Sequence, residues 1–133
     1  MDQQARAASI ETALAIEPGL PRFPSELEVA CFRVVQEAVT NVVRHARARS
    51  FSVELSRHEG ELRVSVRDDG AGFDVEAVRE RARQGKSMGL LGMEERVSLL
   101  GGRFALESRP GSGSEIRAHF PLADTMARPG AGP

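Results

Sequence analysis

Residues 62–73 read LRVSVRDDGAGF, and this stretch decides the fold. From Leu62 to Val66 apolar residues alternate with polar ones, a pattern that predicts a β-strand with one buried face. Two acids, Asp68 and Asp69, then precede two glycines. A carboxylate at a strand end can accept a hydrogen bond from an exocyclic amino group, and glycines let the backbone approach a flat ring closely. The segment fits an adenine pocket, although a plain Asp-Gly turn has the same residues.

Alternating runs on either side of this stretch predict four more strands. Residues 51–55 form one such run, and a short polar segment joins it to residues 62–66 as an antiparallel hairpin. Residues 104–106 and 116–120 form a second hairpin across the turn RPGSGS. Residues 10–16 alternate as well, before the proline-rich break PGLPRFP, and predict a short first strand.

Three helices are predicted between these strands. The longest covers about residues 25–47, where apolar residues recur at helical spacing and Ser25 with Glu28 matches a capping box. A short helix is expected at residues 74–83, with an aspartate as its N-cap and its polar face toward solvent. A third helix, at residues 90–100, ends at two glycines that suit a left-handed cap.

These elements predict an α+β fold, a two-layer α/β sandwich. Strands that alternate apolar and polar residues bury one face, so a single mostly antiparallel sheet with its helices layered on one face is expected. With 133 residues the chain fits one domain, which we place at residues 10–122. Residues 1–9 are an N-terminal flank, and residues 123–133, rich in Ala, Gly and Pro, form a tail.

The composition excludes several classes of protein. Hydrophobic residues make up 41% and charged residues 28%, which is the usual mix of a soluble globular domain. The formal net charge of −1 gives no general attraction to nucleic acid or to anionic lipid. Cys31 has no second cysteine to pair with, and no apolar run is long enough to cross a membrane. A cytoplasmic protein without nucleic-acid or membrane contact is expected.

Two polar residues of the long helix can share one site. Glu37 and Asn41 are four residues apart, so both side chains project from the same helix face. The amide oxygen of Asn41 suits Mg²⁺, a hard cation that takes few protein ligands and keeps water and phosphate oxygens. Glu37 could orient or deprotonate a nucleophile. The same pair would also be ordinary on the solvated face of a helix.

A second glycine motif and a basic segment point to an anion. Residues 87–93, SMGLLGM, open a helix with Gly89 and Gly92, and free N–H groups at a helix start can bind phosphate. The preceding residues 74–88 contain three arginines and Lys86. This segment could close over phosphates as a lid, or it could be a solvated charged surface.

The order of these motifs resembles one family. QEAVTNVVRHA, DDGAGF, GLLGMEERVSLLGG and PGSGSEIRAHFPL are similar to the catalytic domain of sensor histidine kinases of the nitrate-sensor and DesK type. That domain has the Bergerat ATP-binding fold, which histidine kinases share with gyrase, Hsp90 chaperones and MutL. The resemblance covers about residues 10–122. It implies ATP and Mg²⁺ as cofactors and protein-histidine kinase activity.

The resemblance also implies a role for individual residues. Glu37 would act catalytically near the transferred phosphate, Asn41 would hold Mg²⁺, and Asp68 would bind the adenine amino group. The remaining expected nucleotide contacts are Arg44, His45, Gly70, Gly72, Lys86, Gly89, Leu90, Gly92 and Ser114.

The phosphoacceptor is expected on another segment. Kinases of this family carry a helical dimerisation hairpin with a phosphoacceptor histidine, and His45, His58 and His119 do not fit its motif. The implied partners are that hairpin and a downstream response regulator, and the isolated domain is expected to be a monomer. Two alternatives stay open. One is a stand-alone anti-sigma-type serine kinase, and the other is a non-catalytic nucleotide-dependent interaction module.

Overall fold

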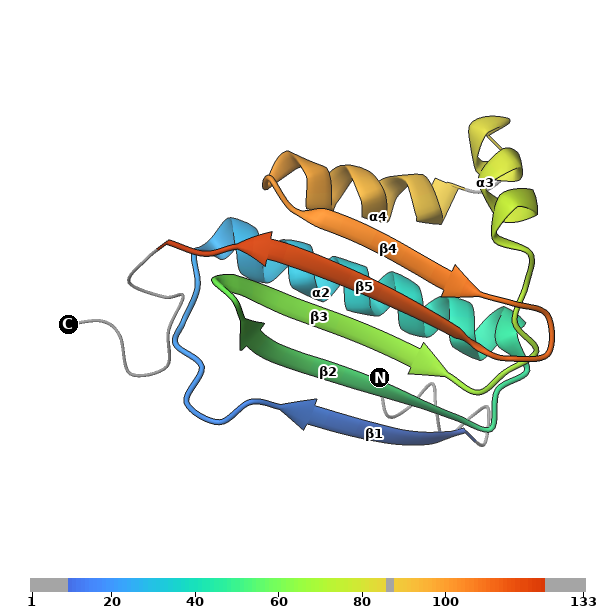
Figure 1. Cartoon of the computed structure of the whole chain (residues 1–133), viewed down its shortest axis with the longest axis horizontal. Coiled ribbons are helices and arrows are strands. Elements are labelled where there is room, and N and C mark those ends of the chain that lie inside the picture. Colours follow the sequence, from blue (N-terminus) through green and yellow to red (C-terminus); the bar gives the residue numbers. More distant parts are fainter. Residues whose placement is uncertain (1–9, 86–87, 124–133) are drawn as a thin grey trace.

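The computed structural model describes residues 10–85 and 88–123, which form a five-stranded sheet with helices on one face (Figure 1). The elements are β1 (Glu11–Ile16), α2 (Ser25–Asn41), the π-helical turn η1 (Val42–Ala46), β2 (Ser50–His58), β3 (Glu61–Asp68), α3 (Val75–Arg83), α4 (Met88–Leu99), β4 (Arg103–Ser108) and β5 (Ser114–Pro121). The strand order is β1-β2-β3-β5-β4. Only β1 and β2 pair in parallel. The predicted α+β sandwich with a mostly antiparallel sheet is confirmed.

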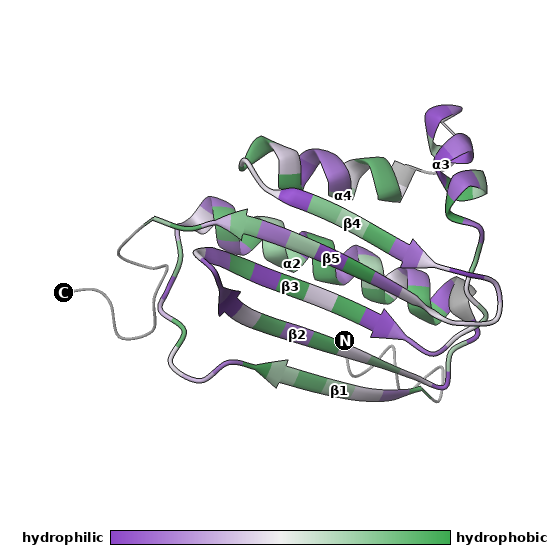
Figure 2. Ribbon diagram, in the orientation of Figure 1, coloured by the Kyte–Doolittle hydropathy of each residue, from purple (hydrophilic) through white to green (hydrophobic). Residues whose placement is uncertain are grey.

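The core lies between the sheet and the helices, as alternation predicts. Leu62 and Val64 of β3 and Phe120 of β5 are almost fully buried, as is Val34 of α2. Figure 2 shows hydrophobic residues alternating along the central strands. Burial of these side chains stabilises the sandwich, at about 2 kcal/mol for each large aliphatic or aromatic side chain.

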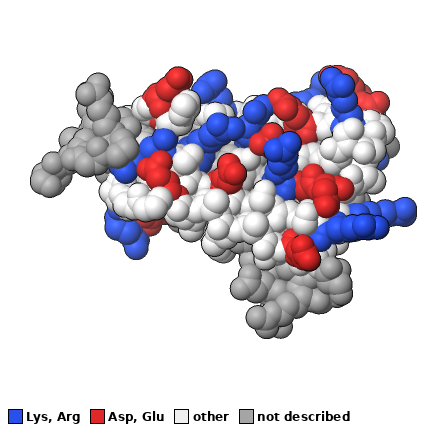
Figure 3. All heavy atoms as spheres, turned by 60° about the horizontal axis from the view of Figure 1, so that its bottom comes forward, with Lys and Arg blue, Asp and Glu red and all other residues white. Residues whose placement is uncertain are grey.

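The outer face of the sheet is polar and carries paired charges. Arg103 Nη2 lies 2.6 Å from Glu61 Oε1, and Arg117 pairs with Glu107. Acidic and basic side chains are intermixed over the face shown in Figure 3. In the described part of the chain, no helix has the length and apolarity needed to span a membrane.

The start of α2 differs from the predicted capping box. Pro24 is the N-cap, Ser25 is already helical, and no side chain caps the helix. Glu28 does reach back, but to the Phe23 N–H, from which it accepts a hydrogen bond of 3.1 Å. Because Pro24 takes the cap position, the helix begins at Ser25, one residue earlier than a Ser25 cap would require.

Cys31 lies within α2 and is partly buried. Its burial, with Glu28 nearby, raises the pKa of the thiol to about 12.

The end of the long helix is not α-helical. Residues 42–46 form a π-helical turn, and Arg47 then takes a left-handed conformation with φ of 53°. The predicted helix therefore has the right extent, but its last turn is wound wider. A left-handed residue at that point turns the chain back toward Ser50, where β2 begins.

The edge strand β1 is present, but the predicted burial of one face is wrong for it. All six residues of β1 are exposed, and Leu14 and Ile16 are exposed by 63% and 53%. They pair with Val53 and Leu55 of β2, whose side chains face the helix layer. The helices do not extend over this edge of the sheet, so the alternation of β1 is not matched by burial.

The shorter helices end as predicted, and α3 also begins as predicted, whereas α4 begins at Met88, two residues before the predicted start. Asp74 caps α3, with its side chain accepting a hydrogen bond of 3.3 Å from the Ala77 N–H. After α4, Gly101 has φ of 73°, and the Gly102 N–H donates to the Val97 carbonyl oxygen at 2.9 Å. This geometry is a left-handed helix end that glycine adopts without strain. α3 lies near the end of the sheet where β3 stops, whereas α4 runs along β4, and the chain that follows it, at Gly101, meets Pro121 at the end of β5 (Figure 1).

Candidate functional site

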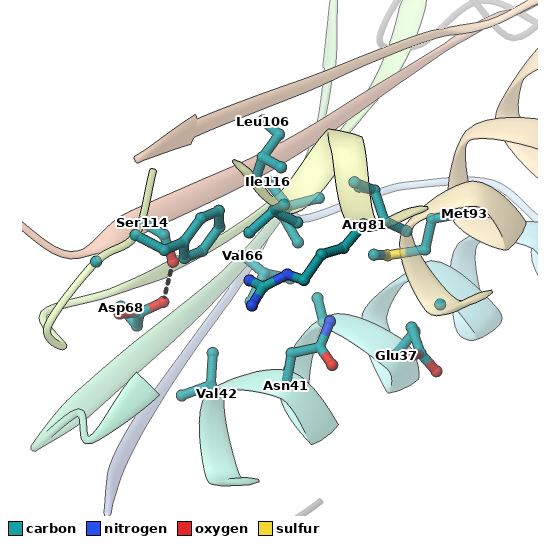
Figure 4. Close-up of a pocket in the computed structure, with 16 residues that line it drawn as sticks. Glu37, Asn41, Val42, Val66, Asp68, Arg81, Met93, Leu106, Ser114 and Ile116 are labelled. Carbon is teal, nitrogen blue, oxygen red and sulfur yellow. Dashed lines mark hydrogen bonds between the residues drawn. The ribbon is translucent and has the colours of Figure 1, made fainter. Parts of the chain in front are cut away.

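A cavity of about 520 Å³ lies between the helices and the sheet, beside the end of β3 and the start of β5 (Figure 4). This volume is within the usual range for small-molecule sites. Seven residues predicted as nucleotide contacts line it, namely Glu37, Asn41, Asp68, Gly72, Gly89, Leu90 and Ser114. They come from α2, the end of β3 and the loop that follows, α4 and β5. The fold thus brings the separate sequence motifs to one cavity.

Asp68 is the buried acid of this cavity, with 8% of its surface exposed. It shares the inward face of β3 with Val64 and Val66, so its carboxylate lies on the helix side. The Gly70 N–H donates to Oδ1 at 2.8 Å, and the Ser114 hydroxyl donates to Oδ2. Ser114 lies directly opposite Asp68 in the β3–β5 register. Each carboxylate oxygen has two lone pairs, so both can still accept a hydrogen bond from a ligand.

The neighbouring acid, Asp69, has a structural role. Its Oδ1 accepts hydrogen bonds from the Arg49 and Ser50 N–H groups at 2.8 and 3.0 Å, and its Oδ2 accepts one from the Ser50 hydroxyl at 2.9 Å. The Ser50 and Arg49 N–H groups, with that hydroxyl, hold the pKa of the Asp69 carboxyl below its usual value. Asp69 fastens the start of β2 to the end of β3.

Glu37 and Asn41 both line the cavity from one face of α2, and both are half-buried. Gly89, at the start of α4, packs against the Glu37 side chain, because a Cβ at residue 89 would overlap the Glu37 carboxylate. A side chain at this position would displace the carboxylate. Gly89 therefore affects the site through the position of Glu37.

The loop around Gly72 is locked by close backbone contacts. Gly72 has φ of 67°, and a Cβ there would overlap the Arg109 carbonyl oxygen. Gly113, with φ of 74°, is just as close to the backbone at the end of β3. The Ser108 hydroxyl accepts a hydrogen bond from the Phe73 N–H and donates one to the Gly113 carbonyl, both at 2.9 Å. These contacts fix the floor of the cavity beside Asp68.

Of the predicted contacts that the structure describes, Arg44, Gly70 and Gly92 do not line the cavity. Gly70 is buried behind it and supports the carboxylate through its N–H. Arg44 is exposed and lies outside the lining, and so does Gly92, where a Cβ would meet no atom within 4 Å. Lys86 and the side chain of His45 lie outside the described residues.

Apart from Leu90, the apolar residues of the cavity were not predicted as site residues, and neither was one arginine. The apolar lining comprises Ala38, Val42, Val66, Phe73, Val78, Leu90, Met93, Leu106 and Ile116. The inward positions of strands and helices were the signal for this wall, but the same signal marks any core residue. Arg81 of α3 belongs to the segment for which the sequence left both a phosphate lid and a solvated surface open, and its side chain extends into the cavity toward Asn41 and Val66 (Figure 4).

The donor set fits a magnesium ion that arrives with a nucleotide. Asn41 supplies an amide oxygen and Glu37 a carboxylate, one helical turn apart in the same cavity. Among residues 10–85 and 88–123, no group of three or more His, Cys, Asp or Glu side chains could hold a metal. Mg²⁺ in nucleotide sites needs only one or two protein ligands, since phosphate and water oxygens complete its shell. Asn41, with Glu37 beside it, would hold such an ion.

The sequence profile of the histidine kinase-, DNA gyrase B- and HSP90-like ATPase family matches residues 26–124. The chain belongs to this family. The match includes all the described residues that line the cavity, among them Glu37, Asn41 and Asp68.

Curated relatives of this chain include sensor kinases. It is 39% identical, over 88% of the chain, to a sensor-like histidine kinase of Chloroflexus aurantiacus. It is 37% identical, over 77% of the chain, to the signal transduction histidine-protein kinase/phosphatase DegS of Bacillus subtilis. The chain spans only 20% and 26% of the length of these relatives. The resemblance to sensor histidine kinases inferred from the motifs is confirmed.

Solved structures support the fold. A histidine kinase domain from the Erythrobacter litoralis EL346 blue-light activated histidine kinase matches with a TM-score of 0.75 and 21% identity, over 91% of this chain and 57% of that one. The Acinetobacter baumannii histidine kinase AdeS matches with a TM-score of 0.69 and 14% identity, over 92% and 59%. At these identities the likeness bears on the fold alone.

Proposed function

We propose that the domain binds Mg²⁺-ATP and donates its γ-phosphoryl group to a histidine on a helical hairpin that the 133 residues do not contain. The observation that carries this proposal is the meeting of Glu37, Asn41 and Asp68 in one cavity of an ATPase-family fold. The named relatives, all sensor kinases, favour this function over an anti-sigma-type serine kinase.

The adenine would bind at the preformed wall. Asp68 would accept a hydrogen bond from the exocyclic amino group, and the Ser114 hydroxyl would hold the carboxylate in place. The apolar residues Val66 and Ile116 would pack against the ring. Burial favours this recognition, because a buried carboxylate loses more when its ligand donor is missing than an exposed one does.

Glu37 and Asn41 would act at the phosphate end. Mg²⁺ held by Asn41 would neutralise charge on the phosphates. Glu37 would accept a hydrogen bond from an imidazole N–H of the incoming histidine, which leaves the other ring nitrogen free to attack the γ-phosphorus. The bond from that phosphorus to the β-γ bridging oxygen would break, and ADP would leave. Positioning and charge neutralisation would supply most of the rate enhancement.

Location and partners follow from this function. We place the unit, residues 10–122, on the cytoplasmic side, where ATP is available, as part of a longer kinase that acts through a response regulator. As an isolated domain it would be a monomer. A tight dimer in sedimentation equilibrium would contradict that assignment.

Titration calorimetry with a non-hydrolysable ATP analogue and Mg²⁺ tests the site. Asp68→Asn is expected to weaken binding by about tenfold or more, because a charged acceptor of the base is lost. Asp69→Asn is the matched control, since it removes the same charge one residue away and should leave affinity within about twofold. Absence of binding by the wild type at millimolar analogue would refute the ATP site and favour the interaction module.

Phosphoryl transfer needs a separate assay. The domain would be incubated with ATP and a histidine-bearing hairpin from a DegS-type relative, and phosphohistidine would be measured. Glu37→Gln is expected to keep nucleotide affinity and to lower the transfer rate by about a hundredfold, as for loss of a general base. Unchanged transfer by Glu37→Gln would remove Glu37 from the reaction.

A further inference from the structure

The last residue of β4 lies level with Asp68 and Ser114 in the sheet. Ser108 is the Cα partner of Ser114 on β5, and Ser114 is the partner of Asp68 on β3. Paired residues on adjacent strands project to the same face of a sheet, so all three side chains point to the helix side. Asp68 and Ser114 line the cavity, but Ser108 is not part of its described lining. An effect of Ser108 on a ligand must therefore pass through other residues.

The Ser108 hydroxyl joins the loop after β3 to the turn before β5. Its one proton is donated to the Gly113 carbonyl oxygen at 2.9 Å, and its oxygen accepts a hydrogen bond from the Phe73 N–H, also at 2.9 Å. Phe73 lines the cavity, and Gly113 directly precedes Ser114. One hydroxyl thus holds a lining residue of the first loop and the entry into the strand that begins with Ser114.

The turn before β5 needs such a contact to have one shape. Gly111 and Gly113 both have left-handed φ values, of 84° and 74°. Glycine is free to adopt many backbone conformations, so the residues of this turn do not fix its shape by themselves. The Gly111 N–H, which donates to the Ala71 carbonyl oxygen, and the Ser108 hydroxyl tie the turn to the loop after β3.

The shape of this turn sets the direction of the Asp68 carboxylate. The Ser114 hydroxyl donates to Oδ2 of Asp68, and the Gly70 N–H donates to Oδ1 at 2.8 Å (Figure 4). A change in the backbone before Ser114 would move that hydroxyl and turn the carboxylate. Hydrogen bonds weaken steeply with angle, so a turned carboxylate would accept a ligand N–H less well.

We propose that Ser108 is a positioning residue for base recognition, which holds Ser114 and thereby keeps the Asp68 carboxylate directed at the exocyclic amino group of the base. The proposal rests on the ATP site proposed above. It goes further by assigning part of the selectivity for that amino group to a residue that does not touch the ligand.

The test compares two nucleoside diphosphates that differ only in the amino group. ADP and the 5′-diphosphate of purine riboside, which lacks that group, would be bound to the wild type and to Ser108→Ala, in competition with a fluorescent adenine nucleotide. The wild type is expected to prefer ADP by about tenfold, because the other ligand leaves a buried carboxylate without its donor. In Ser108→Ala this preference should fall to about twofold, mainly through weaker binding of ADP.

Two further variants separate this role from a general loss of stability. Ser108→Thr keeps the hydroxyl and should retain the wild-type preference. Ser65→Ala removes another buried hydroxyl of the sheet, which donates to Glu115 Oε2 at 2.9 Å on the outer face, away from both loops. It should retain the preference too, whatever stability it loses.

The other results would each overturn the proposal. Equal loss of affinity for both diphosphates in Ser108→Ala would mean that the site is damaged without loss of selectivity. An unchanged preference in Ser108→Ala would remove Ser108 from base recognition, while the ATP site would stand. Loss of the preference in Ser65→Ala as well would show that selectivity follows stability. A wild type that binds neither diphosphate would overturn the ATP site itself.

Discussion

The wall of the cavity around Asp68 is fixed by backbone contacts, whereas α3 on the opposite side is held by few side chains. The glycines Gly72 and Gly113 sit against neighbouring carbonyl oxygens, and Ser108 links the two loops. In α3 only Ala82 is buried, and one ion pair, between Arg79 and Glu94, joins it to α4. The difference teaches that the wall around Asp68 is the more rigid side of the cavity, while α3 can adjust its position.

The largest loss of stability is expected from adding a side chain at Gly72, in the tightly packed wall around Asp68. Gly72→Ala would place a methyl group on the Arg109 carbonyl oxygen and hold alanine at a left-handed φ. We expect the free energy of unfolding to fall by about 3 kcal/mol, from strain and overlap together. Denaturant unfolding followed by circular dichroism would measure it.

Gly60→Ala is the control for this change. Gly60 has φ of 80°, but a Cβ there would meet no atom within 4 Å. It should cost only the backbone strain, about 1 kcal/mol. Equal losses in the free energy of unfolding for Gly60→Ala and Gly72→Ala would mean that the loop around Gly72 can move to accept a methyl group. The contrast between the wall around Asp68 and α3 would then not hold.

A second substitution, at the start of α4, should affect catalysis more than stability. In Gly89→Ala the new methyl group meets the flexible end of Glu37, which can move aside. We expect a loss of about tenfold in phosphoryl transfer, roughly 1.4 kcal/mol in barrier, with ATP affinity nearly kept. Single-turnover transfer to the histidine hairpin would measure the rate. Parallel loss of rate and affinity would indicate that α4 itself had shifted.

Low pH should lower the stability of the domain through protonation of Asp69, which joins the start of β2 to the end of β3. Its pKa is lowered on folding, so it stabilises the fold above the unfolded-state value of about 4, and that contribution is lost as the pH falls through the folded pKa. Asp69→Asn keeps an acceptor oxygen but removes the titration. The stability of the wild type should therefore fall more steeply than that of Asp69→Asn in unfolding experiments from pH 5 downward, in steps of about half a unit. Glu95→Gln, on the exposed face of α4, should keep the wild-type slope.

The smallest effect is expected where α3 is joined to α4. The side chains of Arg79 and Glu94 are both about a third exposed, so Arg79→Gln should cost about 0.5 kcal/mol or less. Amide hydrogen exchange should nevertheless quicken in α3 and stay unchanged in β3 and β5. Faster exchange throughout the domain would show that α3 is not a separate unit.

The sequence predicted the cavity lining around Asp68 better than the lining on α3. Strand alternation distinguishes Asp68 from Asp69. Asp68 lies two residues after Val66 and four after Val64, so its side chain shares their inward face of β3. The position of Arg81 in the cavity lining could not be predicted, because α3 carries several arginines and their directions depend on how the helix packs.

The fold was predicted from the spacing of apolar residues along the sequence. The errors lie where that spacing does not determine how an element packs against its neighbours. The alternation of β1 identified a strand, but whether a helix covers Leu14 depends on the width of the helix layer. The start of α2 was misassigned because Pro24 suits the cap position as well as the serine that follows it. Neither error concerns the cavity.

The parallel pairing of β1 with β2 has a consequence for the order of folding. Glu11 pairs with Ser50, so β1 can gain its hydrogen bonds only after α2 has formed and the chain has returned along the sheet. Closing so long a loop is entropically costly, and β1 buries none of its six residues in return. The first strand of the described chain would therefore join last and separate first, and it could do so while β3, β5 and the cavity beside them stay assembled.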